Sequence, residues 1–245
     1  MSAKTTTPDH INPILSIILP VYMNEKIEDV IRDIDEKVVK QFHEQIGGVE
    51  IIVAQDGTKD NTQKTLKTIQ KKYKLTLNLS EQRRGYIKAA KEVYTQAAGE
   101  YIFFTDGDGE HDPADFWKLW NKMQKNNLDF VVGYKTLRKP FYRVFISKIN
   151  NTLIGILFGL WFKDANCGFR IIKNDVAKKI IPKTGTMKIA WNAESSIYVK
   201  MNGYKYSQVP VKHFPVESVV FSKKKLPKQL FNAFFEVFKL RVKTL

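Results

Sequence analysis

Short apolar runs alternate with amphipathic stretches along most of the chain. The apolar runs are rich in β-branched and aromatic residues, which is typical of buried strands. They cover residues 14–21, 49–54, 75–79, 101–105 and 130–134. The stretches between them repeat apolar residues at helical spacing, over residues 25–45, 60–73, 87–98 and 113–126. This alternation predicts an α/β fold in which helices flank a mostly parallel sheet.

Polar residues follow three of the predicted strands directly. These clusters are residues 22–25, 56–58 and 106–110. Because open α/β sheets bind ligands beyond the carboxyl ends of their strands, the clusters predict the position of a binding site. The sequence has no G-x-G-x-x-G after the first strand and no G-x-x-x-x-G-K-[ST] loop. It therefore lacks the fingerprints of a Rossmann dinucleotide site and of a P-loop.

The third cluster holds three carboxylates in five residues: Asp106, Asp108 and Glu110. Like charges this close repel one another unless a cation lies among them. Carboxylate oxygens suit Mg²⁺ or Mn²⁺, and the intervening glycines let a large ligand approach the backbone. We therefore predict a divalent cation site made of these three residues. The alternative is an acidic turn that caps the next helix.

Charge and composition narrow the class of partner. The 245 residues carry 40 Lys and Arg against 25 Asp and Glu, a formal net charge of +15. Such a surplus favours nucleic acid, a phosphorylated substrate or an anionic membrane. A single cysteine excludes a disulfide framework, and the four histidines lack metal-ligand spacing. The length fits one α/β domain, or one domain with a short appendage.

The chain shows no targeting or membrane-spanning pattern. Residues 1–13 are polar and predict a disordered lead-in rather than a signal peptide. The most apolar later stretch, 152–162, has eleven residues, whereas a transmembrane helix needs about 20. We therefore expect no transmembrane helix and a cytoplasmic chain.

Two segments combine basic and apolar residues. No acidic residue occurs from 130 to 163, and basic side chains lead into a long apolar run over 138–162. Residues 226–245 place apolar side chains on one helical face, namely Leu226, Leu230, Phe234, Phe238, Val242 and Leu245. Basic amphipathic helices with Leu and Phe bind membrane interfaces, so both segments are candidate interfacial helices. The alternative is that they pack on the sheet or on a partner subunit.

Several motifs recur together in one known family. They are IILPVYMNE (17–25), VEIIVAQDGTKDNT (49–62), RRGYIKAAKEVYTQAAGEYIFFTDGDGEHDP (83–113), GYK (133–135), RVFIS (143–147), DANCGFRIIK (164–173) and NGYKYSQVPVKHF (202–214). With them the chain resembles the family 2 glycosyltransferases, and within these the polyprenyl-phosphate sugar transferases of the dolichol-phosphate mannose synthase type. The resemblance implies a GT-A fold, which is a Rossmann-like sheet, over residues 14–223. A basic amphipathic helix would follow over 224–245.

The resemblance also implies a nucleotide-sugar site. Its expected members are Pro20, Tyr22, Glu25, Asp56, Gly85, Lys88, Asp106, Gly107 and Asp108. Asp56 matches an aspartate that contacts the base or the ribose in such enzymes. Asp106 and Asp108 match the DxD pair that binds the metal and the donor diphosphate. Glu110 stands where a Gln metal ligand is common.

A second group of matches implies an acceptor-phosphate site. It consists of Lys135, Arg143, Ser147 and Arg170. Arg143 and Ser147 match an R-x-x-x-S pair, and a spacing of four on a helix puts both side chains on one face. Arg143, Asp106 and Asp108 are the expected catalytic residues.

The chain departs from the subgroup after residue 214. The subgroup carries an Arg and a Gly there, whereas this chain has Val216 or Glu217 in place of the Arg and a Val in place of the Gly. Lys212 or one of residues 223–225 would have to supply the missing cation.

These features predict an inverting, metal-dependent glycosyltransferase. It would move a sugar from a nucleotide-diphosphate sugar to a polyprenyl phosphate on the cytoplasmic face of a membrane. Its expected partners are both substrates, the membrane surface and, optionally, a membrane protein, but no nucleic acid. One alternative is a family 2 enzyme with a glycan or other hydroxyl acceptor, which requires a base; Asp164 and Glu194 are its candidates. A second is a degenerate nucleotide-sugar binder or a basic nucleic-acid-binding protein.

Overall fold

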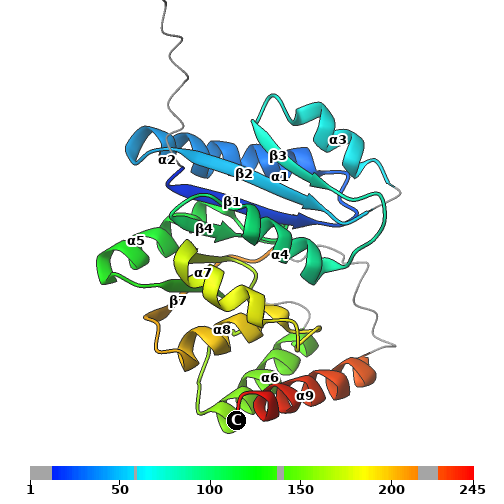
Figure 1. Ribbon diagram of the computed structural model, residues 1–245, viewed down its shortest axis with the longest axis vertical. Helices are drawn as coiled ribbons and strands as arrows, with labels where there is room; N and C mark the ends of the chain where they lie inside the picture. The colour runs from blue at the N-terminus through cyan, green and yellow to red at the C-terminus, as the bar shows by residue number, and fades with distance from the viewer. Residues whose placement is uncertain (1–12, 58–59, 137–140, 215–225) are drawn as a thin grey trace, which may run out of the picture.

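A seven-stranded mixed sheet forms the centre of the molecule (Figure 1). The structure, a computed structural model, describes residues 13–57, 60–136, 141–214 and 226–245. The strands are β1 (Leu15–Val21), β2 (Val49–Gln55), β3 (Leu75–Leu79), β4 (Tyr101–Phe104), β5 (Phe130–Lys135), β6 (Arg170–Lys173) and β7 (Tyr206–Val211). Their order across the sheet is β3-β2-β1-β4-β6-β5-β7.

Strand direction determines where a ligand can bind. The strands β1 to β4 are mutually parallel, and β7 is parallel to β5. Strand β6 runs antiparallel to both β4 and β5. Six strands therefore end at one edge of the sheet, and β6 begins there. The sequence pattern predicted five of these strands, β1 to β5, and the apolar runs gave no signal for β6 or β7.

Helices cover both faces of the sheet. They are α1 (Ile27–Ile34), the π-helical turn η1 (Asp35–Val39), α2 (Lys40–Gln45), α3 (Thr62–Ile69), α4 (Tyr86–Gln96), the 3₁₀ turn η2 (Pro113–Asp115), α5 (Phe116–Asn126), α6 (Phe141–Phe158), α7 (Asn174–Ile180), the 3₁₀ turn η3 (Ile181–Lys183), α8 (Trp191–Met201) and α9 (Leu226–Lys243). Helix α4 packs on β1 and β2, whereas α5 packs on β5, β6 and β7.

Burial explains why the strands are almost continuously apolar. All seven residues of β1 are buried, as expected for a strand with helices on both faces. The same holds for four of the six residues of β5, Phe130 to Gly133. The predicted α/β fold with a mostly parallel sheet is therefore confirmed.

Helices α6 and α9 pack on each other at one end of the molecule, away from β3 (Figure 1). Of the segment predicted as interfacial helices over 138–162, the described residues 141–162 contain a single helix, α6. In the described part of the chain, no helix is long and apolar enough to cross a membrane. Of the predicted lead-in, residues 1–12 lie outside the described residues.

Candidate functional site

The carboxyl edge of the sheet gathers residues from five strands. Asp56 follows β2, Asp106 follows β4, Lys135 ends β5, Arg170 begins β6 and His213 follows β7. Residues far apart in the sequence meet here because six strands end and one begins at this edge. The edge is therefore the candidate active site.

The loop after β4 is bound to the end of β1. The amide of Gly107 donates to the carbonyl of Pro20 (3.2 Å), and its carbonyl accepts from Nδ2 of Asn24 (2.7 Å). A Cβ atom at Gly107 would lie 2.5 Å from Cγ2 of Val21, so only glycine permits this approach. The loop is consequently fixed against β1, with Asp106 on one side of Gly107 and Asp108 on the other.

The three loop carboxylates differ in environment. Burial raises the pKa of Asp106, although a hydrogen bond from the hydroxyl of Tyr86 (2.8 Å) opposes the shift. Desolvation, followed by the charges of Asp106 and Glu110, raises the pKa of Asp108 to about 7. Asp108 is also the exposed member of the three. The electrostatic cost of its charge would be relieved by a divalent cation.

The donor set fits Mg²⁺ or Mn²⁺ in its chemistry. Both ions take carboxylate oxygens, and Mg²⁺ is commonly bound by one or two carboxylates together with substrate phosphates and water. Among the described residues, no group of three His, Cys, Asp or Glu side chains converges into a complete metal site. A cation here would therefore depend on Asp108 and Asp106 and on oxygens from the ligand.

Glu110 is bonded to the neighbouring strands. Its Oε2 accepts from Nε2 of His213 (2.9 Å) and lies 3.7 Å from Nζ of Lys135. Its carbonyl accepts from the amide of Phe214 (2.7 Å). His111 forms an isolated bridge with His213, and burial lowers the pKa of His111 to about 3, which keeps its ring neutral. Glu110, predicted as a metal ligand, thus links the acidic loop to β5 and β7.

Asp56 supports the turn that leads into α4. Its Oδ1 accepts from the amides of Arg84 and Gly85, both at 2.8 Å. Its Oδ2 lies 4.0 Å from Nε of Arg83, whose guanidinium stacks 4.2 Å above the ring of Tyr22. The predicted donor residues Tyr22, Asp56 and Gly85 therefore lie together, with Arg83 as an added cation.

The other predicted donor residues take varied positions. Pro20 is buried in β1. Glu25 is exposed and accepts from the backbone and side chain of Asn61, both at 3.3 Å. Lys88 is exposed on the first turn of α4.

Arg170 points into the protein. It is 1% exposed, and its guanidinium donates to the carbonyls of Cys167 and Asn192 and to Oγ of Ser195. These bonds hold the start of β6 against α8, so the described contacts of Arg170 are structural.

The two candidate bases are also buried. Glu194 is fully buried, and its carboxylate accepts from the amides of Gly185 (2.8 Å), Thr186 (3.2 Å) and Met187 (2.9 Å). Asp164 is 4% exposed and accepts from the amide of Asn166 (3.2 Å). Both carboxylates therefore serve as acceptors for backbone amides.

Part of the predicted acceptor site falls outside the described structure. Ser147 lies partly exposed on α6, whereas nothing is described of the Arg143 side chain on the same helix. Val216, Glu217 and residues 223–225 lie outside the described residues. Lys212 lies next to the site and pairs with Asp112 (3.3 Å).

Sequence reasoning missed three side chains at this edge. Tyr86 donates to Asp106, Asn192 donates to the hydroxyl of Tyr86 (3.3 Å), and His213 donates to Glu110. Tyr86 precedes the helix predicted over 87–98, Asn192 lies in a segment for which no helix was predicted, and His213 is one of four scattered histidines. Only strand order brings them together.

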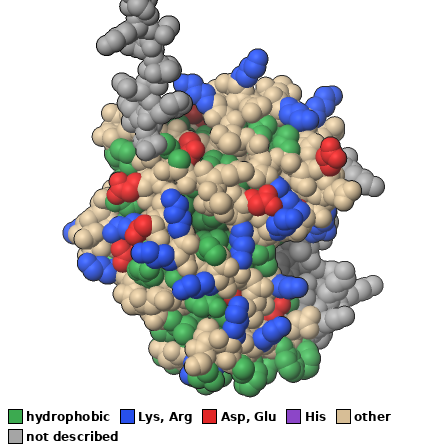
Figure 2. All heavy atoms as spheres, in the orientation of Figure 1, with side chains coloured by type: hydrophobic (Ala, Val, Ile, Leu, Met, Phe, Trp, Pro, Cys, Tyr) green, Lys and Arg blue, Asp and Glu red, His purple; other side chains and the backbone are tan. Residues whose placement is uncertain are grey.

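Helix α9 is apolar on two faces. Val237 and Leu240 are fully buried against the body. Four members of the predicted apolar stripe are exposed, namely Phe234, Phe238, Val242 and Leu245, and so are Phe231 and Phe235 beside them. Ile156 and Trp161, within and just after α6, are 69% and 65% exposed. Hydrophobic side chains accordingly gather on the surface at this end of the molecule (Figure 2).

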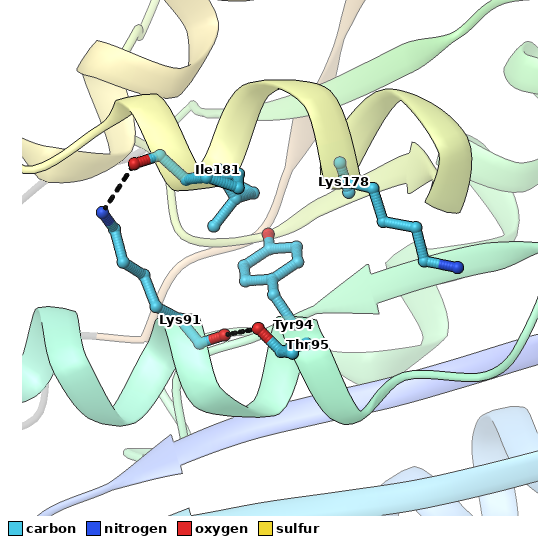
Figure 3. A pocket seen from close by; sticks show the side chains of 7 residues that line it. Lys91, Tyr94, Thr95, Lys178 and Ile181 are labelled. Carbon is cyan, nitrogen blue, oxygen red and sulfur yellow. Dashed lines mark hydrogen bonds between the residues drawn. The ribbon is translucent and has the colours of Figure 1, made fainter.

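A cavity of about 320 Å³ lies between α4 and α7, and it contains none of the predicted site residues (Figure 3). Lys91 lines the cavity, and its Nζ donates hydrogen bonds to the carbonyls of Pro182 and Thr184. The hydroxyl of Tyr94 points into it (Figure 3). The cavity is thus a separate feature on the α7 side of α4.

Comparison with known proteins identifies the family of this chain. Glycosyl transferase family 2 matches residues 16–181, which is more than half of the chain. The chain is 28% identical over 207 residues to a dolichyl-phosphate beta-glucosyltransferase of Dictyostelium discoideum, covering 75% of this chain and 62% of that protein. It is 26% identical over 171 residues to a dodecaprenyl-phosphate galacturonate synthase of Rhizobium johnstonii, covering 68% and 49%. The chain thus matches about half to three fifths of the length of these relatives.

A solved structure has a fold similar to that of this chain. The crystal structure of a glucosyl-3-phosphoglycerate synthase from Mycobacterium tuberculosis, in complex with Mn²⁺, UDP and glucosyl-3-phosphoglycerate, superposes with a TM-score of 0.69 at 16% identity. The match covers 93% of this chain and 79% of that one. The expected GT-A fold is confirmed, and the chain belongs to glycosyl transferase family 2.

Proposed function

We propose that this chain transfers a glycosyl group from a nucleotide-diphosphate sugar to a polyprenyl phosphate at a membrane surface. The observation that carries the proposal is the crowding of Asp106, Asp108 and Glu110 at the carboxyl edge of the sheet. Desolvation, followed by the charges of Asp106 and Glu110, raises the pKa of Asp108 to about 7, and a bound divalent cation would relieve the repulsion among the three carboxylates. The two relatives named for polyprenyl-phosphate substrates support the same acceptor class.

The donor would lie across the ends of β1, β2 and β4. Mg²⁺ or Mn²⁺ held by Asp106 and Asp108 would neutralise the charge that develops on the leaving diphosphate. Tyr22 and Arg83 present a flat, cationic surface beside Asp56, which suits a base and its ribose. Gly107 keeps the loop close to β1, so the loop carboxylates would have a fixed position relative to the donor diphosphate.

A phosphate acceptor fits the burial of the two candidate bases. A phosphate oxygen is already an anion and can attack the anomeric carbon in a single displacement, which inverts the centre. A hydroxyl acceptor requires a base, yet Asp164 and Glu194 are buried and accept backbone amides. We assign the acceptor phosphate to Arg143 and Ser147 on α6. Lys135 adds positive charge at the end of β5.

The second apolar face of α9 would contact the bilayer. Among residues 231–245 the one carboxylate, Glu236, accepts from the amide of Ile189 (2.9 Å) and therefore turns toward the body. The exposed phenylalanines are accompanied by Lys239 and Lys243. Aromatic and basic side chains on one helix surface are typical of binding to anionic interfaces.

A transfer assay tests the proposal. Purified protein would be incubated with polyprenyl phosphate in liposomes, Mg²⁺ or Mn²⁺, and labelled UDP-, GDP- and dTDP-sugars, and label would be counted in the organic extract. We expect label from one donor, and its loss with EDTA. Label on a glycan or on a small hydroxyl acceptor alone would overturn the lipid acceptor. Binding of nucleotide without transfer to any acceptor would overturn catalysis.

A further inference from the structure

Asp106 is held on both sides, unlike Asp108. Its Oδ1 accepts from the hydroxyl of Tyr86 at 2.8 Å. On the other side, a Cβ atom built on Gly168 would lie 2.1 Å from Oδ2, so the carboxylate packs directly on this glycine. An aspartate side chain otherwise rotates broadly about its terminal torsion. These two contacts restrict the rotation of the Asp106 carboxylate.

Tyr86 is itself fixed by the structure around it. It is the first residue of α4 and follows Gly85, whose φ of 91° is in the region that glycine favours. Asp56 accepts the amides of both Arg84 and Gly85, which sets the path of this turn. The ring of Tyr86 lies edge-on to the indole of Trp191 at 6.0 Å. The turn before α4 and the contact with Trp191 therefore fix the position from which the Tyr86 hydroxyl donates to Asp106.

Asn192 completes the arrangement from α8. It is 7% exposed, and its Nδ2 donates to the hydroxyl of Tyr86 at 3.3 Å. The Tyr86 hydroxyl oxygen accepts the hydrogen bond from Asn192, and the hydroxyl proton is donated to Asp106. The Oδ1 of Asn192 is buried and has no hydrogen-bond partner within the described residues. Buried amide oxygens are seldom left without a hydrogen bond, because this lowers the stability of the fold. The orientation of the Asn192 amide toward Tyr86 therefore has a cost in stability.

We propose that Tyr86 and Asn192 are positioning residues that hold the Asp106 carboxylate in the orientation required by a divalent cation and a nucleotide diphosphate. The inference rests on the proposed function, because it concerns the same site. Partners that orient a metal ligand from outside commonly contribute roughly 10- to 100-fold to metal affinity or activity. Tyr86 and Asn192 would act by positioning Asp106, since neither residue needs to contact the substrate.

The chain offers a matched control. Tyr94 lies on the same helix and contacts the same indole, with ring centroids 6.3 Å apart. Its hydroxyl points into the cavity beside α7 rather than to a loop carboxylate (Figure 3). Tyr94→Phe therefore removes a tyrosine hydroxyl from the same helix without removing a hydrogen bond to Asp106. Because Tyr86 is 38% exposed, Tyr86→Phe leaves no buried cavity and is expected to fold.

Manganese titration of the full chain tests the proposal without any acceptor. Free Mn²⁺ would be measured by electron paramagnetic resonance, with UDP and separately with GDP, and melting temperatures would be recorded for each variant. We expect Tyr86→Phe to weaken Mn²⁺ binding in the presence of the effective nucleotide about tenfold. Tyr94→Phe should stay within about twofold of wild type at a similar melting temperature.

The outcomes separate the two proposals. Wild-type affinity in Tyr86→Phe, or equal losses in Tyr86→Phe and Tyr94→Phe, would overturn the positioning role and leave the proposed function standing. A wild-type protein that binds no Mn²⁺ with either nucleotide would overturn the metal-dependent function, and the positioning role with it.

Discussion

The Oε2 atom of Glu110 lies 2.9 Å from Nε2 of His213, whose side chain is 1% exposed. This bond joins the acidic loop after β4 to the residues that follow β7, two segments on opposite sides of β6 and β5. Lys135 at the end of β5 lies 3.7 Å from the same oxygen. Glu110 therefore connects the loop after β4 to the ends of β5 and β7. Its carboxylate has this structural function in addition to any contact with a metal ion.

We expect Glu110→Gln to lower stability more than metal affinity. The variant loses the charge that faces His213 and Lys135, and hydrogen bonds to charged groups are worth roughly 1.5–3 kcal/mol. Mn²⁺ affinity with UDP or GDP should stay within about threefold, because the variant retains both aspartates. Thermal melting and Mn²⁺ titration check this. A loss of Mn²⁺ affinity as large as that of Asp108→Asn would identify Glu110 as a ligand.

Asp108→Asn should abolish turnover and leave the fold intact. Asp108 is the exposed carboxylate of the loop, and it has the raised pKa of about 7. We expect a loss above the roughly 100-fold that follows removal of an outer partner of a metal ligand. The melting temperature should equal or exceed that of wild type, because repulsion from Asp106 and Glu110 is relieved. An active Asp108→Asn protein would contradict the metal assignment.

The fold followed from the sequence far better than the site did. The apolar runs at 14–21 and 49–54 became β1 and β2 because central strands with helices on both faces must be apolar throughout. Strand β6 escaped detection because a basic residue stands at each end of its four residues, so it forms no apolar run like that of β4. The acidic loop was found because its carboxylates are contiguous in sequence.

Long-range pairings account for what the sequence could not predict. Tyr86 and Asn192 meet across 106 residues, and Glu110 and His213 across 103. Glu194 was a candidate base, yet three backbone amides occupy its carboxylate. Only the order of the strands decides such contacts, and single-sequence patterns carry no information on that order.

The Cys167 thiol should be unreactive in the native protein. Burial raises its pKa to about 11, so only about one thiol in a thousand is ionised at pH 8. We expect Ellman's reagent to label Cys167 at least ~100-fold faster in guanidinium chloride, because a free thiol has a pKa near ~8.5. An acid whose pKa is raised on folding stabilises the folded state below its unfolded pKa and loses that contribution as pH rises. The native rate should therefore keep rising to pH 9, and a plateau near pH 8 would contradict this.

Substitutions on the outer face of α9 should weaken membrane binding alone. Phe234 and Phe238 are 50% and 51% exposed, so Phe234→Ser combined with Phe238→Ser is expected to leave the melting temperature unchanged. Burial of a Phe side chain is worth roughly 1.5–3 kcal/mol, so co-sedimentation with anionic vesicles should fall at least ~10-fold. Met201→Ser, an exposed apolar residue at the end of α8, is the control. Unchanged vesicle binding in the double variant would contradict the membrane assignment.

Gly168→Ala should displace Asp106 without a mutation in the acidic loop itself. The new Cβ atom would lie 2.1 Å from Oδ2 and 2.9 Å from Cγ of Asp106, a distance that forces the carboxylate to move. Gly168 does not have a positive φ, so alanine adds crowding rather than backbone strain. We expect Mn²⁺ affinity in the presence of UDP or GDP to fall about tenfold or more. Gly48→Ala, whose Cβ atom would meet its nearest atom at an ordinary 3.4 Å, should bind as wild type. If Gly168→Ala kept full affinity, the orientation of Asp106 would not matter to the cation, and the positioning role of Tyr86 would fail by the same measurement.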